Sequence, residues 1–159
     1  MKINTIISPD DIIVGLKANS KKQVLQEMAA RVTAPVDGLE TRLVFDHLME
    51  RERLGCTSIG GGIAIPHTRC AFPENIGNKP LTQLAILNKP IDFQSNDDHP
   101  VDIVFMLIAP DHIGGEHLTA LALASRLLRD DDRATHLRGC DSVEAVWSIL
   151  NNAEISDAA

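Results

Sequence analysis

The fold is decided by one apolar run in the second half of the chain, Val101-Asp102-Ile103-Val104-Phe105-Met106-Leu107-Ile108. Every side chain but that of Asp102 is apolar, and several are branched at the β carbon. A strand with one face in water alternates apolar and polar residues, whereas a strand buried on both faces reads as a continuous apolar run. We therefore expect this segment to be the centre of a β-sheet that carries helices on both faces.

Helical and strand patterns alternate on either side of this run. Ser20-Lys21-Lys22-Gln23 has the form of a capping box, and the apolar residues after it recur on one helical face until Pro35. Further helices are expected at 39–54, 118–128, 132–138 and 141–150, and short apolar segments or strands at 12–16, 63–65 and 81–87. Residues 68–79 carry proline and glycine and are typical of a loop.

This alternation predicts an α/β fold, a single-domain sandwich with a mixed, mostly parallel β-sheet flanked by helices on both faces. The chain of 159 residues fits one domain, which we place at 1–150. Residues 151–159 offer little apolar surface to bury, so we expect a flexible C-terminal tail there.

Composition limits the classes of function. The formal net charge is -7 and basic residues never form a run longer than two, so nucleic-acid binding is not expected. The longest apolar stretches, such as 103–109, are far shorter than a membrane-spanning helix, so insertion into a membrane is not expected either. The three cysteines lack a C-x-x-C pair, which fits neither a disulfide framework nor a zinc knuckle. The first residues lack the apolar region of a signal peptide. We expect the protein to act in the cytoplasm, with proteins or small molecules as partners.

A glycine-rich segment supplies the first candidate site, Gly60-Gly61-Gly62-Ile63-Ala64-Ile65-Pro66-His67. Glycine lets the backbone approach an anion closely, and Pro66 stiffens the exit from the short strand. We expect His67 to stand at a strand end beside main-chain amides. Because an imidazole with a pKa of about 6.5 keeps a large neutral fraction at cellular pH, His67 is a candidate to accept and pass on a phosphoryl group.

Phosphoryl transfer needs donors for the negative charge of the transferred group. His117 follows Gly114-Gly115 at the expected start of a helix, where the helix dipole favours an anion, and it is the candidate second histidine. Arg51 is the candidate guanidinium, with Arg53 as a competitor. The alternative for Arg51 is a solvated surface charge paired with a neighbouring glutamate, and the alternative for the glycines is a plain loop.

Other chemistries fit the sequence less well. His112 and His117 lack the i, i+4 spacing of a helical zinc site, and no cysteine completes a tetrahedral set, so we expect no metal and no cofactor. Cys70 lies three residues after His67 without an orienting partner for a thiol nucleophile. The triple glycine is not followed by the lysine and serine of a Walker A loop.

The segment 54–69, preceded by Arg51-Glu52-Arg53, resembles the signature of the enzyme IIA components of the bacterial phosphotransferase system, mannitol and fructose type. The nearest branch is that of the nitrogen-regulatory IIA proteins. The likeness extends over nearly the whole chain through Pro100-Val101-Asp102, Glu116-His117-Leu118 and Ala124-Ser125-Arg126-Leu127. The chain departs from the familiar pattern at three positions, Cys56, Ser58 and Gly61.

The resemblance implies an α/β sandwich in which His67 accepts a phosphoryl group from the phosphohistidine of a small carrier protein of the nitrogen branch. That carrier is fed from phosphoenolpyruvate by an enzyme I. His117 matches the family's second active-site histidine, and Arg51 matches its active-site arginine. The phosphorylated and free forms would regulate different protein targets, potassium-transport and sensor-kinase systems among them.

Two other functions stay open. The chain also fits a sugar-specific IIA component that passes its phosphoryl group to a separate IIB domain of a transporter. A function of a different class is a protein-binding module in which His67 is never phosphorylated.

Overall fold

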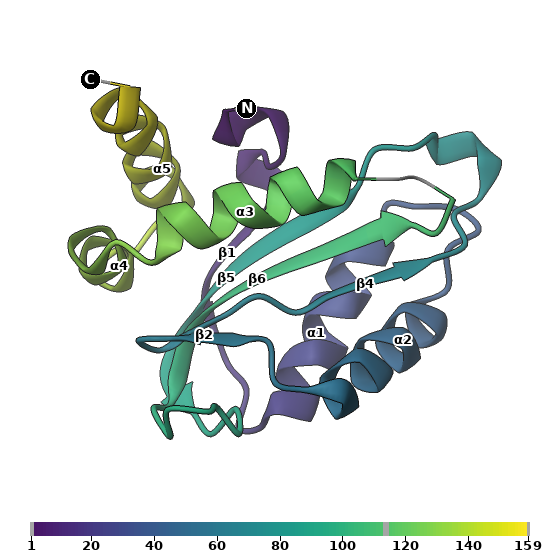
Figure 1. Cartoon of the computed structure of the whole chain (residues 1–159), viewed down its shortest axis with the longest axis horizontal. Coiled ribbons are helices and arrows are strands. Elements are labelled where there is room, and N and C mark those ends of the chain that lie inside the picture. Colours follow the sequence, from purple (N-terminus) through teal and green to yellow (C-terminus); the bar gives the residue numbers. More distant parts are fainter. Residues whose placement is uncertain (1, 113–114, 159) are drawn as a thin grey trace.

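The computed structural model describes residues 2–112 and 115–158, and within these ranges the chain forms six strands and five α-helices (Figure 1). The strands are β1 (Ile12–Leu16), β2 (Ser58–Gly60), β3 (Ile63–Ala64), β4 (His67–Cys70), β5 (Leu81–Ile91) and β6 (Val101–Pro110). The helices are α1 (Lys21–Thr33), α2 (Thr41–Leu54), α3 (Glu116–Leu128), α4 (Asp131–Arg138) and α5 (Val143–Ala158). Short 3-10 turns lie at Ile3–Thr5, Pro9–Asp11 and Glu74–Ile76.

Strand β6 lies at the centre of the sheet, as the apolar run predicts. The strand order is β1-β5-β6-β3-β2, and β4 also pairs with β6. Strand β5 runs antiparallel to β6, whereas β3 and β4 run parallel to it. With the parallel β1–β5 pair and the antiparallel β2–β3 pair, three of the five pairings in the described residues are parallel. The expected mixed, mostly parallel sheet is confirmed.

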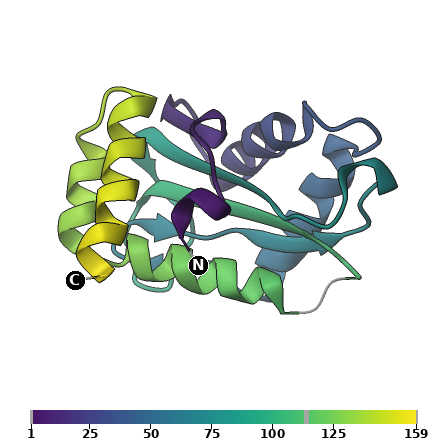
Figure 2. The ribbon, with the colours of Figure 1, turned by 90° about the horizontal axis from the view of Figure 1, so that it is seen from above.

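Side chains of β6 alternate between two apolar clusters, one on each face of the sheet. Figure 2 shows α3 along one side of the sheet and α1 and α2 along the other. The cluster under α3, α4 and α5 receives Ile103, Phe105 and Leu107, and the cluster under α1 and α2 receives Val104, Met106 and Ile108. All six side chains are at most 2% exposed, which explains why the strand carries no polar alternation. The predicted helical layers on both faces are thereby confirmed.

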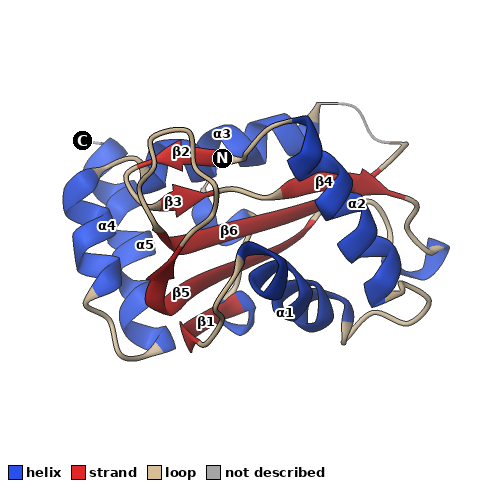
Figure 3. Ribbon diagram, turned by 90° about the horizontal axis from the view of Figure 1, so that it is seen from below, coloured by secondary structure: helices blue, strands red, loops and turns tan. Residues whose placement is uncertain are grey.

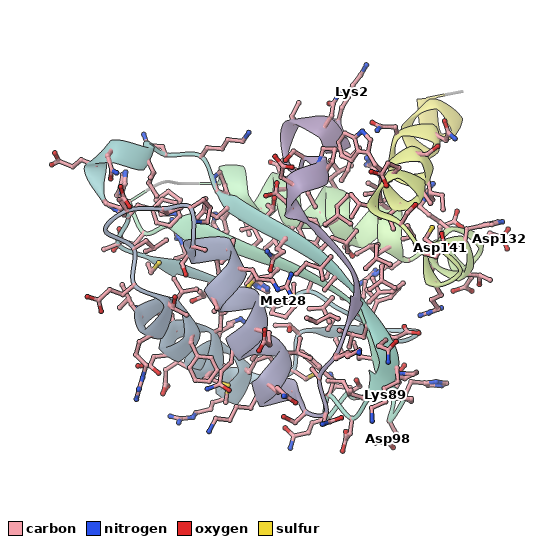
Figure 4. All side chains as sticks on the ribbon, turned by 180° about the vertical axis from the view of Figure 1, so that it is seen from behind. Lys2, Met28, Lys89, Asp98, Asp132 and Asp141 are labelled. Carbon is pink, nitrogen blue, oxygen red and sulfur yellow. The ribbon has the colours of Figure 1, made fainter. Side chains whose placement is uncertain are left out.

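Helix α1 begins and packs as its sequence predicts. The hydroxyl of Ser20 accepts a hydrogen bond from the N–H of Gln23 over 3.1 Å, which caps the first turn. Its apolar face points to the sheet, and Met28, labelled in Figure 4, is fully buried there. Helix α2 buries Val44, Leu48 and the charged Glu52.

The structure extends the strands beyond the predicted segments. A loop is expected over 68–79, but residues 68–70 form β4 together with His67, and β4 pairs with β6 from His67 opposite Leu107 to Cys70 opposite Pro110. Strand β2 was not expected either. Both are short strands at the margin of the sheet, and backbone pairing suffices to hold such strands without a periodic apolar pattern. Figure 3 shows β3 and β4 as two consecutive pieces along β6.

Two expectations concern segments near the limits of the description. The predicted turn at Gly114-Gly115 lies partly outside the described residues, since the structure describes 115 but not 114. Helix α5 includes residues 151–158, which the sequence analysis assigns to a flexible tail, and that flexibility stays a prediction. None of the helices in 2–112 and 115–158 is long and apolar enough to cross a membrane.

Candidate functional site

His67 lies where the strand that borders β6 is interrupted. The chain pairs with β6 through Ile63 and Ala64, and pairing resumes at His67 directly after Pro66. The carbonyl of Pro66 still accepts the N–H of Leu107 over 3.0 Å, so the interruption leaves the chain against β6. The register sets His67 opposite Leu107, whose side chain packs on the α3 side of the sheet. His67 is half-buried there and begins a strand rather than ending one.

The His67 ring has a defined arrangement of its two nitrogens. Nδ1 lies 2.8 Å from the carbonyl oxygen of Ile65. Because a carbonyl only accepts, Nδ1 carries the hydrogen, and in the neutral ring the lone pair is on Nε2. Burial lowers the pKa of His67, the hydrogen bond to Ile65 opposes this effect, and the charge of Arg51 lowers the pKa further. The lowered pKa favours the neutral ring at pH 7, in which Nε2 carries the free lone pair.

Arg51 and Arg53 have different surroundings, although both lie in the last turn of α2. Arg51 donates from Nη1 to the carbonyl of Gly55 over 3.0 Å, and its charge acts on His67. Arg53 forms an ion pair of 2.6 Å with Glu50, and both of these side chains are mostly exposed. The reading as a solvated charge paired with a neighbouring glutamate thus describes Arg53, whereas Arg51 belongs to the neighbourhood of His67.

His117 reaches the same neighbourhood from the other side of the sheet edge. It is the second residue of α3, it is half-buried, and its charge also lowers the pKa of His67. Two N–H groups of the first turn, those of Leu118 and Thr119, donate to the carbonyl of Gly115. The structure therefore gathers His67, His117 and Arg51, and their roles in chemistry stay predictions.

The glycine segment does not lie beside His67, which corrects our expectation. Gly60 ends β2, and Gly61 and Gly62 form the turn to β3, at the left end of the sheet in Figure 1, whereas β4 points to the right. The N–H of Gly61 donates to Asp97 over 3.2 Å, and its carbonyl accepts from Arg138 over 2.6 Å. His67 lies five positions after Gly62, and five steps along an extended chain span about 16 Å. The three positive φ values serve a tight hairpin rather than an anion.

The positions that depart from the familiar pattern support this hairpin and the segment that leads to it. The thiol of Cys56 donates to the carbonyl of Phe93 over 3.5 Å, and the hydroxyl of Ser58 accepts from the N–H of Gly60 over 3.3 Å. None of these contacts involves His67.

Sequence reasoning missed Glu52, a buried carboxylate whose charge raises the pKa of His67 and so opposes Arg51. A signal was available in the spacing. Val44, Leu48 and Glu52 are four residues apart, and residues at this spacing share one face of a helix. The charges on either side of Glu52 in the sequence concealed that it continues the buried row.

Thiol and metal chemistry find no support at this site. Cys70 is buried, and burial, with the charge of Asp111, raises the pKa of its thiol to about 11, so it is not a thiolate at neutral pH. Among the residues that the structure describes, no group of three or more His, Cys, Asp or Glu is placed to hold a metal ion.

Comparison with known proteins identifies the family of the chain. Residues 5–153 match the family described as "Phosphoenolpyruvate-dependent sugar phosphotransferase system, EIIA 2". A nitrogen regulatory protein of Bradyrhizobium diazoefficiens is 46% identical over 150 residues, which are 94% of this chain and 95% of that protein. The fructose-specific EIIABC component of Bacillus subtilis is 30% identical over 95% of this chain, which matches 23% of that protein.

The fold agrees with the same assignment. The crystal structure of the nitrogen regulatory protein IIA-Ntr from Neisseria meningitidis is similar with a TM-score of 0.83 at 29% identity, over 93% of this chain and 98% of that one. The resemblance seen in the sequence is confirmed. The chain belongs to the EIIA 2 family of the phosphoenolpyruvate-dependent sugar phosphotransferase system and is a homologue of its nitrogen regulatory proteins.

Proposed function

We propose that this protein is a phosphoryl carrier of a nitrogen-branch phosphotransferase system, and that His67 accepts the phosphoryl group from a small histidine phosphocarrier. The observation that carries the proposal is the state of the His67 ring. Nδ1 donates a hydrogen bond to the Ile65 carbonyl, the lowered pKa favours the neutral ring at pH 7, and Nε2 then holds the lone pair. Such a nitrogen is the form of histidine that attacks phosphorus.

The transfer requires little from the protein beyond alignment and charge. The lone pair of Nε2 forms the new N–P bond, the N–P bond to the carrier's histidine breaks, and its electron pair returns to the carrier's imidazole. The proton on Nδ1 stays in place and faces the Ile65 carbonyl while the ring gains positive charge. Arg51 and His117 are the proposed donors to the phosphoryl oxygens, whose negative charge they offset.

The surface around these residues suits a protein as the donor. Leu54 and Leu118 are 85% and 60% exposed, and they rank among the large apolar side chains that the fold leaves in water. Leu54 lies three residues after Arg51, and Leu118 directly follows His117. Exposed apolar residues beside polar groups mark protein interfaces. We therefore place the docking surface of the carrier protein over the ends of α2 and α3.

Phosphorylation would also act as a signal. A phosphoryl group adds about two negative charges to a surface that partners contact. We expect the protein to act in the cytoplasm, with regulated targets among potassium-transport and sensor-kinase systems. These targets would then distinguish the phosphorylated form from the free form. Support comes from the curated relatives that carry the name nitrogen regulatory protein.

The test is acid-labile labelling with radioactive phosphoenolpyruvate, an enzyme I and the small phosphocarrier of the nitrogen branch. Wild type is expected to take up one phosphoryl group and His67→Ala none, while His117→Ala is expected to be labelled more slowly. Wild type without label would contradict the carrier function and favour a binding module. Label that persists in His67→Ala would assign the acceptor to another histidine.

A second candidate is a sugar-specific IIA component, favoured by the likeness to the fructose-specific EIIABC component of Bacillus subtilis. The same labelled protein separates the two. Chase of the label onto an added fructose-type IIB domain would support sugar transport, and retention of the label would support regulation.

A further inference from the structure

A buried ion pair joins Glu52 of α2 to Lys21 of α1, and the charge of Glu52 acts on His67. The side chain of Glu52 is 4% exposed, and its Oε2 lies 2.7 Å from Nζ of Lys21. The Lys21 ammonium also lies over the ring of Phe93, 4.9 Å from the ring centroid. Burial of a carboxylate is costly unless a cation and hydrogen-bond donors compensate it. Burial of Glu52 and Lys21 therefore carries a desolvation penalty that an apolar pair in the same place would avoid.

Glu52 also fixes the segment between α2 and β2. The N–H of Thr57 donates to Oε2 of Glu52 over 3.3 Å, and the Thr57 hydroxyl donates to Oε1. Both carboxylate oxygens are thus occupied, by Lys21 and by two donors of a single residue. Two donors from one residue define the orientation of its peptide as well as its position.

Hydrogen bonds continue from Thr57 to the ring of His67. The carbonyl of Thr57 accepts the N–H of Ile65 over 3.0 Å. The carbonyl of the same Ile65 accepts Nδ1–H of His67 over 2.8 Å. Glu52 and His67 are therefore joined through two intervening residues, and the orientation of the Ile65 peptide sets the orientation of the ring.

We propose that Glu52 is a positioning residue for the phosphoryl acceptor, which through Thr57 and Ile65 holds the His67 ring with its hydrogen on Nδ1 and its lone pair on Nε2. This inference rests on the proposed function, in which Nε2 attacks phosphorus. The carboxylate has a second effect on the same atom, because its charge raises the pKa of His67 against the effects of burial and Arg51. A more basic nitrogen is the better nucleophile.

The experiment compares Glu52→Gln with a matched control, Glu50→Gln. Glutamine keeps the shape of the side chain but removes the charge and the ion pair with Lys21. Glu50 lies on the same helix, is exposed, and forms an ion pair with Arg53 at the surface. In Glu52→Gln we expect the population of the Nδ1–H tautomer to fall relative to the Nε2–H tautomer. We also expect the pKa of His67 to fall and the initial transfer rate to drop about tenfold. In Glu50→Gln all three should match wild type.

A second pair of variants covers the case that Glu52→Gln does not fold. Thr57→Val removes the hydroxyl that donates to Glu52 and keeps the backbone contacts, whereas Thr57→Ser keeps the hydroxyl. We expect Thr57→Val to weaken the Nδ1–H tautomer in the same direction as Glu52→Gln. Thr57→Ser should restore it.

Nitrogen-15 NMR of the histidine ring reads the tautomer and the pKa without any transfer reaction. Wild-type tautomer and pKa in the folded Glu52→Gln and Thr57→Val variants would overturn the proposal, even if both variants melt at lower temperature. A merely structural role lowers the melting temperature and leaves the ring unchanged. Absence of label in wild type would instead contradict the proposed function, and the NMR outcome would still decide the role of Glu52.

Discussion

A β carbon at Gly62 would lie 2.7 Å from Nη2 of Arg138, closer than such atoms approach in proteins. Arg138 is held in that place, because its Nε donates to both oxygens of Asp102 over 2.8 and 2.9 Å. Its Nη2 also donates to the carbonyl of Gly61. The turn between β2 and β3 therefore packs against Arg138, and its glycines are required by this contact with α4 rather than by His67.

Gly62→Ala should destabilise the fold and leave phosphoryl transfer intact. The φ of +84° and the crowding by Arg138 together predict a loss of about 2–3 kcal/mol in the free energy of unfolding. Gly61→Ala is the matched control, since its φ is +65° but nothing lies within 4 Å of the added β carbon, and we expect a loss of about 1 kcal/mol. Urea unfolding measures both. If Gly62→Ala is stable but no longer phosphorylated, the glycines contribute to the phosphorylation site after all.

The glycines show why this part of the site escaped prediction. Five residues are a short interval in the sequence, but in an extended strand they span about 16 Å. Sequence reasoning placed the amides of Gly60–Gly62 beside His67 because it could not tell a strand that continues from a strand that ends. The strand continues because β4 pairs with β6, and no periodic pattern in the sequence predicts this pairing.

Arg51→Gln should raise the pKa of His67 and slow its phosphorylation about a hundredfold. The pKa rises because the guanidinium charge lowers it in wild type, and the rate falls because one donor to the phosphoryl oxygens is lost. Arg53→Gln is the control, since Arg53 pairs with Glu50 at the surface. An NMR titration of His67 and the initial labelling rate are the measurements. Equal effects of the two substitutions would remove Arg51 from its special role.

Stability should depend on pH through His67. Its pKa in the folded protein is lower than the ordinary value of 6.5, so between these two values the unfolded chain binds a proton that the folded chain does not. The free energy of unfolding therefore decreases as the pH falls through this window and stays lower beneath it. His67→Gln, which does not titrate, should lose less stability than wild type as the pH falls through and below 6.5. Identical pH dependences would show that the His67 pKa is not lowered.

The parts that could be predicted are those in which local pattern and final environment agree. Every residue of the run over 101–108 except Asp102 is apolar because both faces of β6 are buried, so its position at the sheet centre follows from composition alone. The charge of His117 acts on His67 because α3 follows β6 in the chain and β4 pairs with β6, which is a matter of topology. Glu52 shows the opposite case, in which a charged residue is buried because Lys21 and Thr57 come from elsewhere in the chain.

Leu54→Ser should weaken the interaction with the phosphocarrier without affecting the fold. Leu54 is 85% exposed, so its replacement removes little from the core. In the complex, burial of its apolar surface against the carrier would stabilise binding. We expect the KM for the phosphocarrier to rise about fivefold to tenfold, with kcat and the melting temperature unchanged. Leu43→Ser is the control on the same helix. Leu43 is 39% exposed and lies eleven residues away, which is about 16 Å along the helix axis. If both substitutions raise the KM equally, or if neither does, the carrier docks elsewhere, and the surface over the ends of α2 and α3 is not its binding site.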